Sequence, residues 1–253
     1  ENVTLIMVED AGNGNDIIDL LGVLAEVDID GGVGNDTITL KDRGEDTDVI
    51  GSGVVNGGSG NDTITVTGEG PSLVLNGDAG NDTITAGKAS VTINGGDGSD
   101  VITGTANDDE LNGDAGSDTI TAYAGNDIIK GGSGNDKIDA DTGDDDVEGG
   151  EGADTIDGGL GNDFLDGGGE DDTLNGSAGN DILVGGPGED SLRGHGGVDL
   201  LIGDTFDAFN KATLLTQITN IANGAPPASI DVNDIGLNDD ADTAGDDELI
   251  GGG

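Results

Sequence analysis

Residues 131–139 read Gly-Gly-Ser-Gly-Asn-Asp-Lys-Ile-Asp. Six turn-forming residues precede a strand of three residues, and within that strand only the middle side chain, Ile138, needs burial. A unit of this size cannot fold alone, because it cannot bury a hydrophobic core of its own. It gains stability only when similar units stack against it, so the stretch predicts one repeat of a solenoid.

The aspartate of this unit recurs at every ninth position from Asp100 to Asp199, and an aliphatic residue stands two positions after each. Stacking in this register would join the aliphatic side chains into one core and align the carboxylates along the turns. The chain has no Trp, one Tyr and three Phe, so the core must be thin and aliphatic. The predicted core row is Ile18, Ile38, Ile64, Ile84, Ile102, Leu111, Ile120, Ile129, Ile138, Val147, Ile156, Leu165, Leu174, Leu183, Leu192 and Leu201.

The pattern Gly-Gly-x-Gly-x-Asp-x-aliphatic-x resembles the repeats-in-toxin (RTX) nonapeptide family. Twelve aspartates in phase make this match specific, whereas a single Gly-x-Gly-x-Asp also occurs in ordinary turns. The resemblance implies an all-β fold, a right-handed parallel β-roll or β-helix solenoid with calcium-binding turns. Close forms of the pattern stand at 31–39, 57–65, 95–103, 131–139, 149–157 and 158–166, and weaker forms fill the rest of 76–203.

The resemblance also implies the metal ligands. Calcium takes about six to eight oxygen ligands, which stacked turns can supply jointly and a single carboxylate cannot. In the family, the motif aspartate contributes carboxylate oxygens and the glycine-rich turn contributes main-chain carbonyls. The candidate aspartates are Asp16, Asp36, Asp62, Asp82, Asp100, Asp109, Asp118, Asp127, Asp136, Asp145, Asp154, Asp163, Asp172, Asp181, Asp190, Asp199 and Asp247. The candidate carbonyl donors include Gly58, Gly60, Gly96, Gly98, Gly132, Gly134, Gly150, Gly152, Gly159 and Gly161.

Charge makes calcium a condition for folding. The chain carries 54 acidic and 7 basic residues, a formal net charge of -47. Composition alone would indicate disorder, but the periodicity argues against it. If the implied sites hold about a dozen Ca²⁺ ions, their roughly +24 would cancel about half of the excess charge. We therefore expect calcium to be structural, and we expect no nucleic-acid partner.

The spacing of the turn aspartates divides the chain. Residues 95–203 are expected to form a regular roll, in which coils of 18 residues carry calcium turns on both edges. Residues 1–94 are expected to form a half-calcium roll with plain loops on one edge. The reason is that the turn aspartates there lie 18 to 26 residues apart, at Asp16, Asp36, Asp62 and Asp82.

Four turns depart from the pattern and are expected to bind calcium weakly or to be distorted. The departures are Asn107 and Glu170, which replace a glycine before Asp109 and Asp172, and Ala122-Tyr123 and Ala140-Asp141, which replace a glycine pair before Asp127 and Asp145.

Residues 204–244 have a different composition and are expected to form a helix and a loop. Apolar residues recur at helical spacing between Thr205 and Ala222, and Asn223-Gly224 is a stop signal. This short helix is expected to cap the roll, with a partner-binding helix as the alternative. Residues 245–253 restart the repeat. The apolar residues of the predicted helix are Phe206, Phe209, Leu214, Leu215, Ile218 and Ile221.

Threonines flank the core row on successive coils and should form an outward-facing ladder. They are Thr37 and Thr39, Thr63 and Thr65, Thr83 and Thr85, Thr103, and Thr119 and Thr121. Threonine is favoured at exposed strand positions even where it has no binding role. Two alternatives remain, O-linked glycans and an ice-binding face similar to the threonine arrays of some antifreeze proteins.

Other features bound the function. The chain has no cysteine, so calcium is the expected substitute for disulfide cross-links. The resemblance to the RTX family implies weak calcium sites made of oxygen ligands, which fill at extracellular calcium of about 0.1 to 1 mM. No stretch is long and apolar enough for a membrane span. The single histidine, His195, lies in a turn, and no catalytic constellation accompanies it, so an enzyme is not expected. The chain begins at Glu1 without Met, so processing or truncation upstream is expected.

These observations favour a secreted or cell-surface bacterial protein with a structural role. We expect calcium to fold the chain into a stiff acidic rod, which assembles head to tail into filaments or a surface layer. The alternative is a folding, secretion or stalk module of a larger secreted enzyme or adhesin. Threonine-mediated binding of ice or glycans is a lesser alternative.

Overall fold

The structure, a computed structural model, describes residues 5–8, 11–21, 26–41, 52–68, 72–203 and 248–250. These residues form strands and the turns between them, and no helix occurs among them. The helix predicted at 205–222 lies outside the described residues, as does the rest of 204–247. The repeat that restarts at 245–253 is described only through a strand at 248–250.

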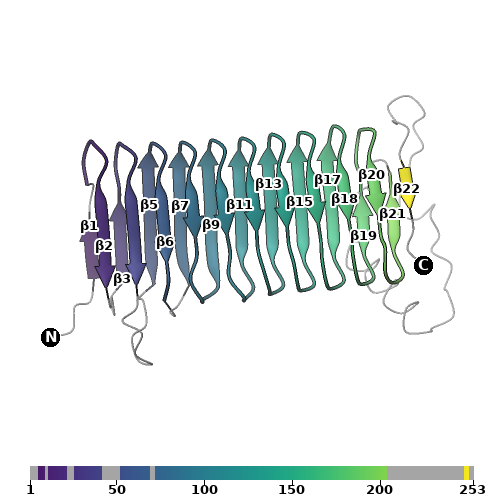
Figure 1. Cartoon of the computed structure of the whole chain (residues 1–253), viewed down its shortest axis with the longest axis horizontal. Coiled ribbons are helices and arrows are strands. Elements are labelled where there is room, and N and C mark those ends of the chain that lie inside the picture. The colour runs from purple at the N-terminus through teal and green to yellow at the C-terminus, as the bar shows by residue number, and fades with distance from the viewer. Residues whose placement is uncertain are drawn as a thin grey trace.

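The strands form two parallel sheets of eleven strands each, which run the length of a rod (Figure 1). The odd-numbered strands form one sheet: β1 (Leu5–Val8), β3 (Glu26–Asp30), β5 (Gly53–Ser59), β7 (Leu73–Ala79), β9 (Val91–Asp97), β11 (Glu110–Ala115), β13 (Ile128–Ser133), β15 (Asp146–Glu151), β17 (Phe164–Gly169), β19 (Ile182–Val184) and β21 (Leu200–Ile202). The even-numbered strands form the other: β2 (Ile17–Leu21), β4 (Thr37–Lys41), β6 (Thr63–Val66), β8 (Thr83–Thr85), β10 (Val101–Thr103), β12 (Thr119–Thr121), β14 (Lys137–Asp139), β16 (Thr155–Asp157), β18 (Thr173–Asn175), β20 (Ser191–Arg193) and β22 (Glu248–Ile250).

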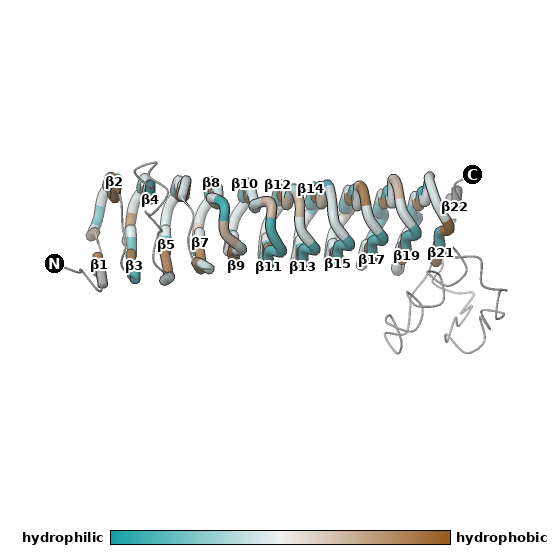
Figure 2. The backbone as a smooth tube through the Cα atoms, turned by 90° about the horizontal axis from the view of Figure 1, so that it is seen from below, coloured by the Kyte–Doolittle hydropathy of each residue, from teal (hydrophilic) through white to brown (hydrophobic). Residues whose placement is uncertain are grey.

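Each coil of the chain adds one strand to both sheets. Every strand pairs in parallel with the strand two places further along the sequence, so the sheet order skips the intervening strand. Figure 2 shows the odd strands along one side of the rod and the even strands along the other. The predicted all-β parallel solenoid is confirmed.

The pairing register carries the sequence period. Leu111 pairs with Ile129, and Ile129 pairs with Val147, which is a step of 18 residues for each coil. The step is longer near the start, where Val27 pairs with Gly53. Identical positions of successive repeats therefore stand side by side, and the early coils differ in the number of residues between their strands.

Inward aliphatic side chains from both sheets build the core; most later strands contribute one, whereas β3, β4, β6, β7 and β9 contribute two each. The predicted row forms a single cluster, in which most members are fully buried and Ile18 and Leu201 are partly buried. Burial of each such side chain contributes about 1.5 to 3 kcal/mol. Fixing the backbone of one residue costs about 1 to 2 kcal/mol. A coil with two core side chains therefore needs a further source of stability.

The predicted threonine ladder is confirmed on the even sheet. Thr63 pairs with Thr37 and with Thr83, and Thr65 pairs with Thr39 and with Thr85. Alternation places these side chains outward, because the isoleucine between them is buried. The two threonine rows continue to β12, where Thr119 and Thr121 stand.

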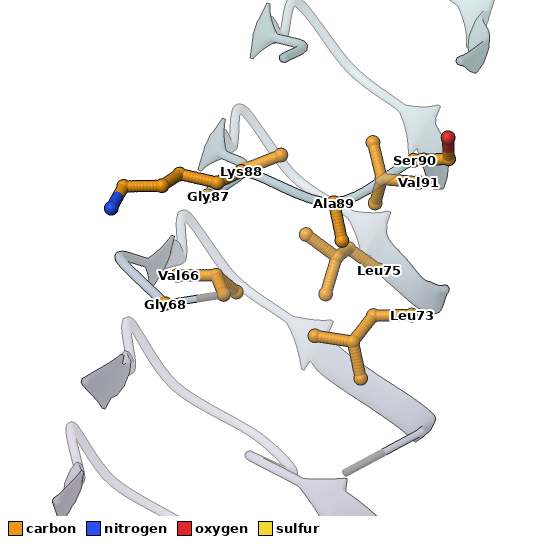
Figure 3. A pocket seen from close by; sticks show the side chains of 10 residues that line it. Val66, Gly68, Leu73, Leu75, Gly87, Lys88, Ala89, Ser90 and Val91 are labelled. Carbon is orange, nitrogen blue, oxygen red and sulfur yellow. The ribbon is translucent and has the colours of Figure 1, made fainter. Parts of the chain in front are cut away.

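The connections from even to odd strands in the first coils carry no turn aspartate. Two of them, after β6 and after β8, border a hollow lined by Val66, Leu73, Leu75, Ala86 and Val91 (Figure 3). Its volume of about 10 Å³ is what one water molecule requires. Because its lining is apolar, this hollow is a packing defect at a plain loop and too small for a ligand.

Within the described ranges no helix is long and apolar enough to cross a membrane.

Candidate metal centre

The turn aspartates lie on two edges of the rod, where the chain passes from one sheet to the other. We call the passage from odd to even strands the long edge and the passage from even to odd strands the short edge. The long edge carries Asp16, Asp36, Asp62, Asp82, Asp100, Asp118, Asp136, Asp154, Asp172 and Asp190. The short edge carries Asp109, Asp127, Asp145, Asp163, Asp181 and Asp199. Asp247 lies outside the described residues.

Hydrogen bonds link the turn aspartates of each edge from coil to coil. The main-chain N–H of Asp100 donates to Asp118 Oδ1 (2.7 Å), and that of Asp118 donates to Asp136 Oδ1 (2.8 Å). The short edge repeats the arrangement, since the N–H of Asp127 donates to Asp145 Oδ1 (2.8 Å). Each carboxylate is therefore held in one orientation by the preceding coil, with one oxygen used and the other fixed in place.

The second oxygen has no partner. In fifteen of the sixteen described turn aspartates, Oδ2 is buried and accepts no hydrogen bond. A buried polar atom without a partner costs free energy, and an unpaired buried charge costs more. Two parallel rows of such oxygens fit the binding of cations along each edge.

Main-chain oxygen atoms approach the same places. A Cβ atom added to Gly95 would stand 2.5 Å from Asp100 Oδ2 and 2.7 Å from the carbonyl oxygen of Gly113 in the next coil. At Gly31 a Cβ would stand 2.8 Å from Asp36 Oδ2 and 2.5 Å from a carbonyl oxygen. A carboxylate and a carbonyl from neighbouring coils thus converge beside one glycine. Oxygens of these two kinds are the ligands that Ca²⁺ prefers.

The candidate glycine carbonyls fall into two groups. In the first group, the carbonyl oxygen of Gly159 accepts a hydrogen bond from the N–H of Ala178 (2.9 Å) and keeps one lone pair. Gly58, Gly96, Gly132 and Gly150 occupy the same turn position at strand ends. In the second group, within the described turns, no main-chain N–H donates to the carbonyl oxygen; its members are Gly60, Gly98, Gly134, Gly152 and Gly161. The carbonyl oxygens of the second group are therefore more available as metal ligands than those of the first group.

Side chains alone cannot complete a metal site. Among the residues whose positions are described, no group of three or more His, Cys, Asp or Glu side chains lies close enough to hold an ion. Carbonyl oxygens must therefore supply the remaining ligands, as the resemblance implied. The donor set fits a hard cation, because it consists of carboxylate and carbonyl oxygens only.

Electrostatics also favour a bound cation. Burial, with a smaller contribution from neighbouring carboxylates, raises the pKa of Asp118, Asp127 and Asp145 to about 7, although the hydrogen bond from the N–H of the preceding coil lowers it in part. The same causes raise the pKa of Asp172 to about 8. The ionised rows are thus disfavoured at neutral pH unless positive charge lies beside them.

Asp109 differs from the other turn aspartates. Its Oδ2 accepts a hydrogen bond from the N–H of Thr105 (2.7 Å), and its Oδ1 accepts from the hydroxyl of Thr105 (3.1 Å) and from the N–H of Val91 (2.9 Å). Protein donors therefore satisfy both oxygens of this carboxylate. Asp109 is the first aspartate of the short edge, so Thr105 supplies hydrogen-bond donors to the carboxylate at the end of that row.

The turns before Asp127 and Asp145 are not distorted. Tyr123 (φ 79°) and Asp141 (φ 70°) adopt the left-handed conformation that glycine has in other turns. The ladder hydrogen bonds run through both turns without interruption, and Oδ2 of Asp127 is buried like the rest. The expectation of distortion was wrong because the stacked neighbours hold these residues in an unfavourable conformation. Weaker calcium binding there stays a prediction.

The sequence analysis missed a second ladder beside the aspartates. The residue before each turn aspartate often accepts a hydrogen bond from the next coil, as when Asn61 Oδ1 accepts from the N–H of Asn81 (2.9 Å). A third ladder joins the side-chain amides of Asn56, Asn76 and Asn94 on the odd sheet. The recurring Gly-Asn-Asp and Asn-Gly steps were the available signals for both.

Comparison with known families agrees with this geometry. The family model described as RTX calcium-binding nonapeptide repeat (4 copies) matches residues 49–66, 76–111, 103–138, 139–174 and 175–207, which together cover more than half of the chain. The chain belongs to the RTX calcium-binding repeat family. No curated protein matches it. RTX repeats bind calcium, and the unpartnered Oδ2 atoms mark where the aspartates of this RTX roll would hold it.

Proposed function

We propose that this RTX chain is an extracellular structural protein that calcium folds into a rigid rod. The observation that carries the proposal is the two rows of buried, unpartnered Oδ2 atoms. Folding brings these carboxylates together, and calcium removes the cost, so metal binding and folding are one event. A stiff, acidic rod is the product.

The ion count follows from the edges. One ion between each pair of successive turns would give about a dozen sites along the two rows. The Asp109 turn is left out of this count, because Thr105 satisfies its carboxylate.

An extracellular location fits the chemistry. The sites use oxygen ligands only, and such sites in extracellular modules bind calcium at about 0.1 to 1 mM, far above cytosolic levels. No cysteine is present to cross-link the chain, so calcium would take that role outside the cell.

The proposal also includes head-to-tail association of the rods. In the described part of the chain, β1 and β21 have a neighbour on one side only, at opposite ends of the odd sheet. Edges of this kind pair readily with other strands. The alternative is that the roll serves as a module of a larger secreted enzyme or adhesin.

A calcium titration that starts from EDTA-treated protein distinguishes the self-assembling rod from the module of a larger protein. Far-UV circular dichroism follows folding, and light scattering follows assembly in the same sample. We expect a coil-to-β transition together with growth to large particles. The same transition with monomer scattering would favour the module, and strand structure that persists in EDTA would contradict calcium-dependent folding.

The threonine face is a second candidate site. From β4 to β12 its ten outward positions are nine threonines and Val101, in unbroken register. A flat, regular array of this kind suits an ordered partner surface such as ice, and it also offers hydroxyls for O-linked glycans. Thermal hysteresis of the calcium-loaded protein tests ice binding, and intact mass of the natively expressed protein tests glycosylation.

A further inference from the structure

The odd sheet has two outward rows of side chains. Leu165 and Leu183 belong to the buried core, so the residues on either side of each face away from it. Pairing aligns Phe164 with Ile182 in one row and Asp166 with Val184 in the other. The rows continue onto β21, where Ile182 and Val184 pair with its first and last residues.

The chemistry of these rows changes along the rod. On β11, β13 and β15 four of the six members are charged, namely Glu110, Lys130, Asp146 and Glu148, and the other two are Asn112 and Ile128. On the last three strands of the sheet five of the six members are apolar, and the exception is Asp166 on β17. We call these residues the outer apolar patch: Phe164, Ile182, Val184, Leu200 and Ile202.

Four of the five patch residues are shielded from solvent although the patch faces outward, and Leu200 is partly exposed. Ile182 is 0% exposed, Val184 1%, Ile202 6% and Phe164 8%. Ile128 stands in the same outward row and is 49% exposed, so the sheet itself does not shield these positions. On the even sheet of the same coils, Thr173 and Arg193 are exposed. A covering layer is thus needed on one face of the rod only.

The chain itself offers a cover at this place. Six residues join β19 to β20, whereas 45 residues separate β21 from β22. The long connection begins at Gly203, directly after the last residue of the patch. Its first part carries six apolar residues at helical spacing, among them Phe209 and Leu214. An amphipathic segment of this kind must bury its apolar stripe against another surface.

We propose that residues 205–222 dock through this apolar stripe on the outer apolar patch. The segment covers the side of the roll and leaves its end strands free. This sharpens the expectation of a cap, since lateral docking does not compete with head-to-tail association.

Trypsin provides a direct test on the full calcium-loaded chain. Lys211 is the sole tryptic site between residues 204 and 253. We expect slow cleavage there in the parent protein and at least about tenfold faster cleavage in Val184→Asp, because a buried charge prevents docking. Thr173→Asp, on the exposed even face, is the matched control and should leave the rate unchanged.

A reciprocal change guards against misfolding of the roll. Phe209→Ser alters the segment and not the sheet, and it should also accelerate cleavage while the calcium-induced circular dichroism stays at the parent level. Cleavage equally fast in parent and variants would overturn the proposal. So would a parent protein that sediments as a dimer and becomes monomeric in Val184→Asp, because a second copy would then be the cover.

Discussion

The main-chain N–H of Asp118 donates a hydrogen bond of 2.8 Å to Oδ1 of Asp136, which lies one coil further along the rod. This bond fixes the carboxylate so that Oδ2 stays buried without a partner. The same hydrogen bond therefore joins two successive coils and orients the carboxylate of the candidate metal site.

Asp136→Asn should remove charge from one turn and keep the acceptor for Asp118. We expect about one fewer bound calcium and a loss of about 2 to 3 kcal/mol in stability at calcium near 100 times the dissociation constant. Calorimetric titration and thermal melts measure both. Asp28→Asn, on the exposed outer face of β3, is the control. Equal calcium counts in the two variants would argue against the assignment.

Asp109→Asn should behave differently from Asp127→Asn. Thr105 already satisfies both oxygens of Asp109, whereas Asp127 Oδ2 has no partner. We expect the calcium count to fall only in Asp127→Asn. Thr105→Val should cost about 1 to 3 kcal/mol, because a buried carboxylate loses a hydroxyl donor. A lower count in Asp109→Asn would show that this turn also holds metal.

In the absence of calcium, acid should favour the fold. Burial raises the pKa of Asp118 to about 7 and of Asp172 to about 8, above the ordinary value of 3.8. A raised folded-state pKa gives stability that is complete below the unfolded value and is lost as pH rises through the folded value. Strand content in EGTA should thus be higher near pH 5 than near pH 8, as measured by far-UV circular dichroism. With calcium present, acid should instead displace the metal. Equal strand content at both pH values without calcium would refute the argument.

Tyr123→Gly should stabilise the calcium-loaded roll by about 1 kcal/mol. Tyr123 adopts φ 79°, where a Cβ is unfavourable and glycine is not. Tyr123→Ala keeps the Cβ and should show no such gain. Chemical denaturation of the three proteins in saturating calcium decides the point, and an equal gain for alanine would attribute the effect to the exposed ring instead.

Gly98→Ala should destabilise the roll by about 3 kcal/mol. Its φ is 139°, and a Cβ there would collide with the carbonyl oxygen of Gly80 in the preceding coil. Gly169→Ala is the matched control, because nothing lies within 4 Å of its Cβ position. Similar melting temperatures for the two variants would mean that the coils can separate to accept the methyl group.

Spacing alone predicted much of this molecule. The nine-residue period placed Ile138 in the core and Asp136 in a turn, because each repeat has the same local chemistry. It did not predict the hydrogen bonds between Thr105 and Asp109, since these depend on which coil begins a row. Nor did it predict the left-handed Tyr123 or the shielding of Ile182. The conformation of Tyr123 depends on contacts with neighbouring coils, and the shielding of Ile182 depends on contacts across the face of the sheet. The sequence of a single repeat contains neither kind of information.

The aspartate ladder runs in one direction only, since every rung donates from one coil to the carboxylate of the next. Within this ladder, any plane drawn across the rod between two coils therefore has amide donors on one side and carboxylate acceptors on the other. The rod has a chemical polarity, and its opposite faces are complementary. A duplicated or deleted pair of repeats would meet a matching surface on either side, so a chain of this design can change length by whole coils without a new interface.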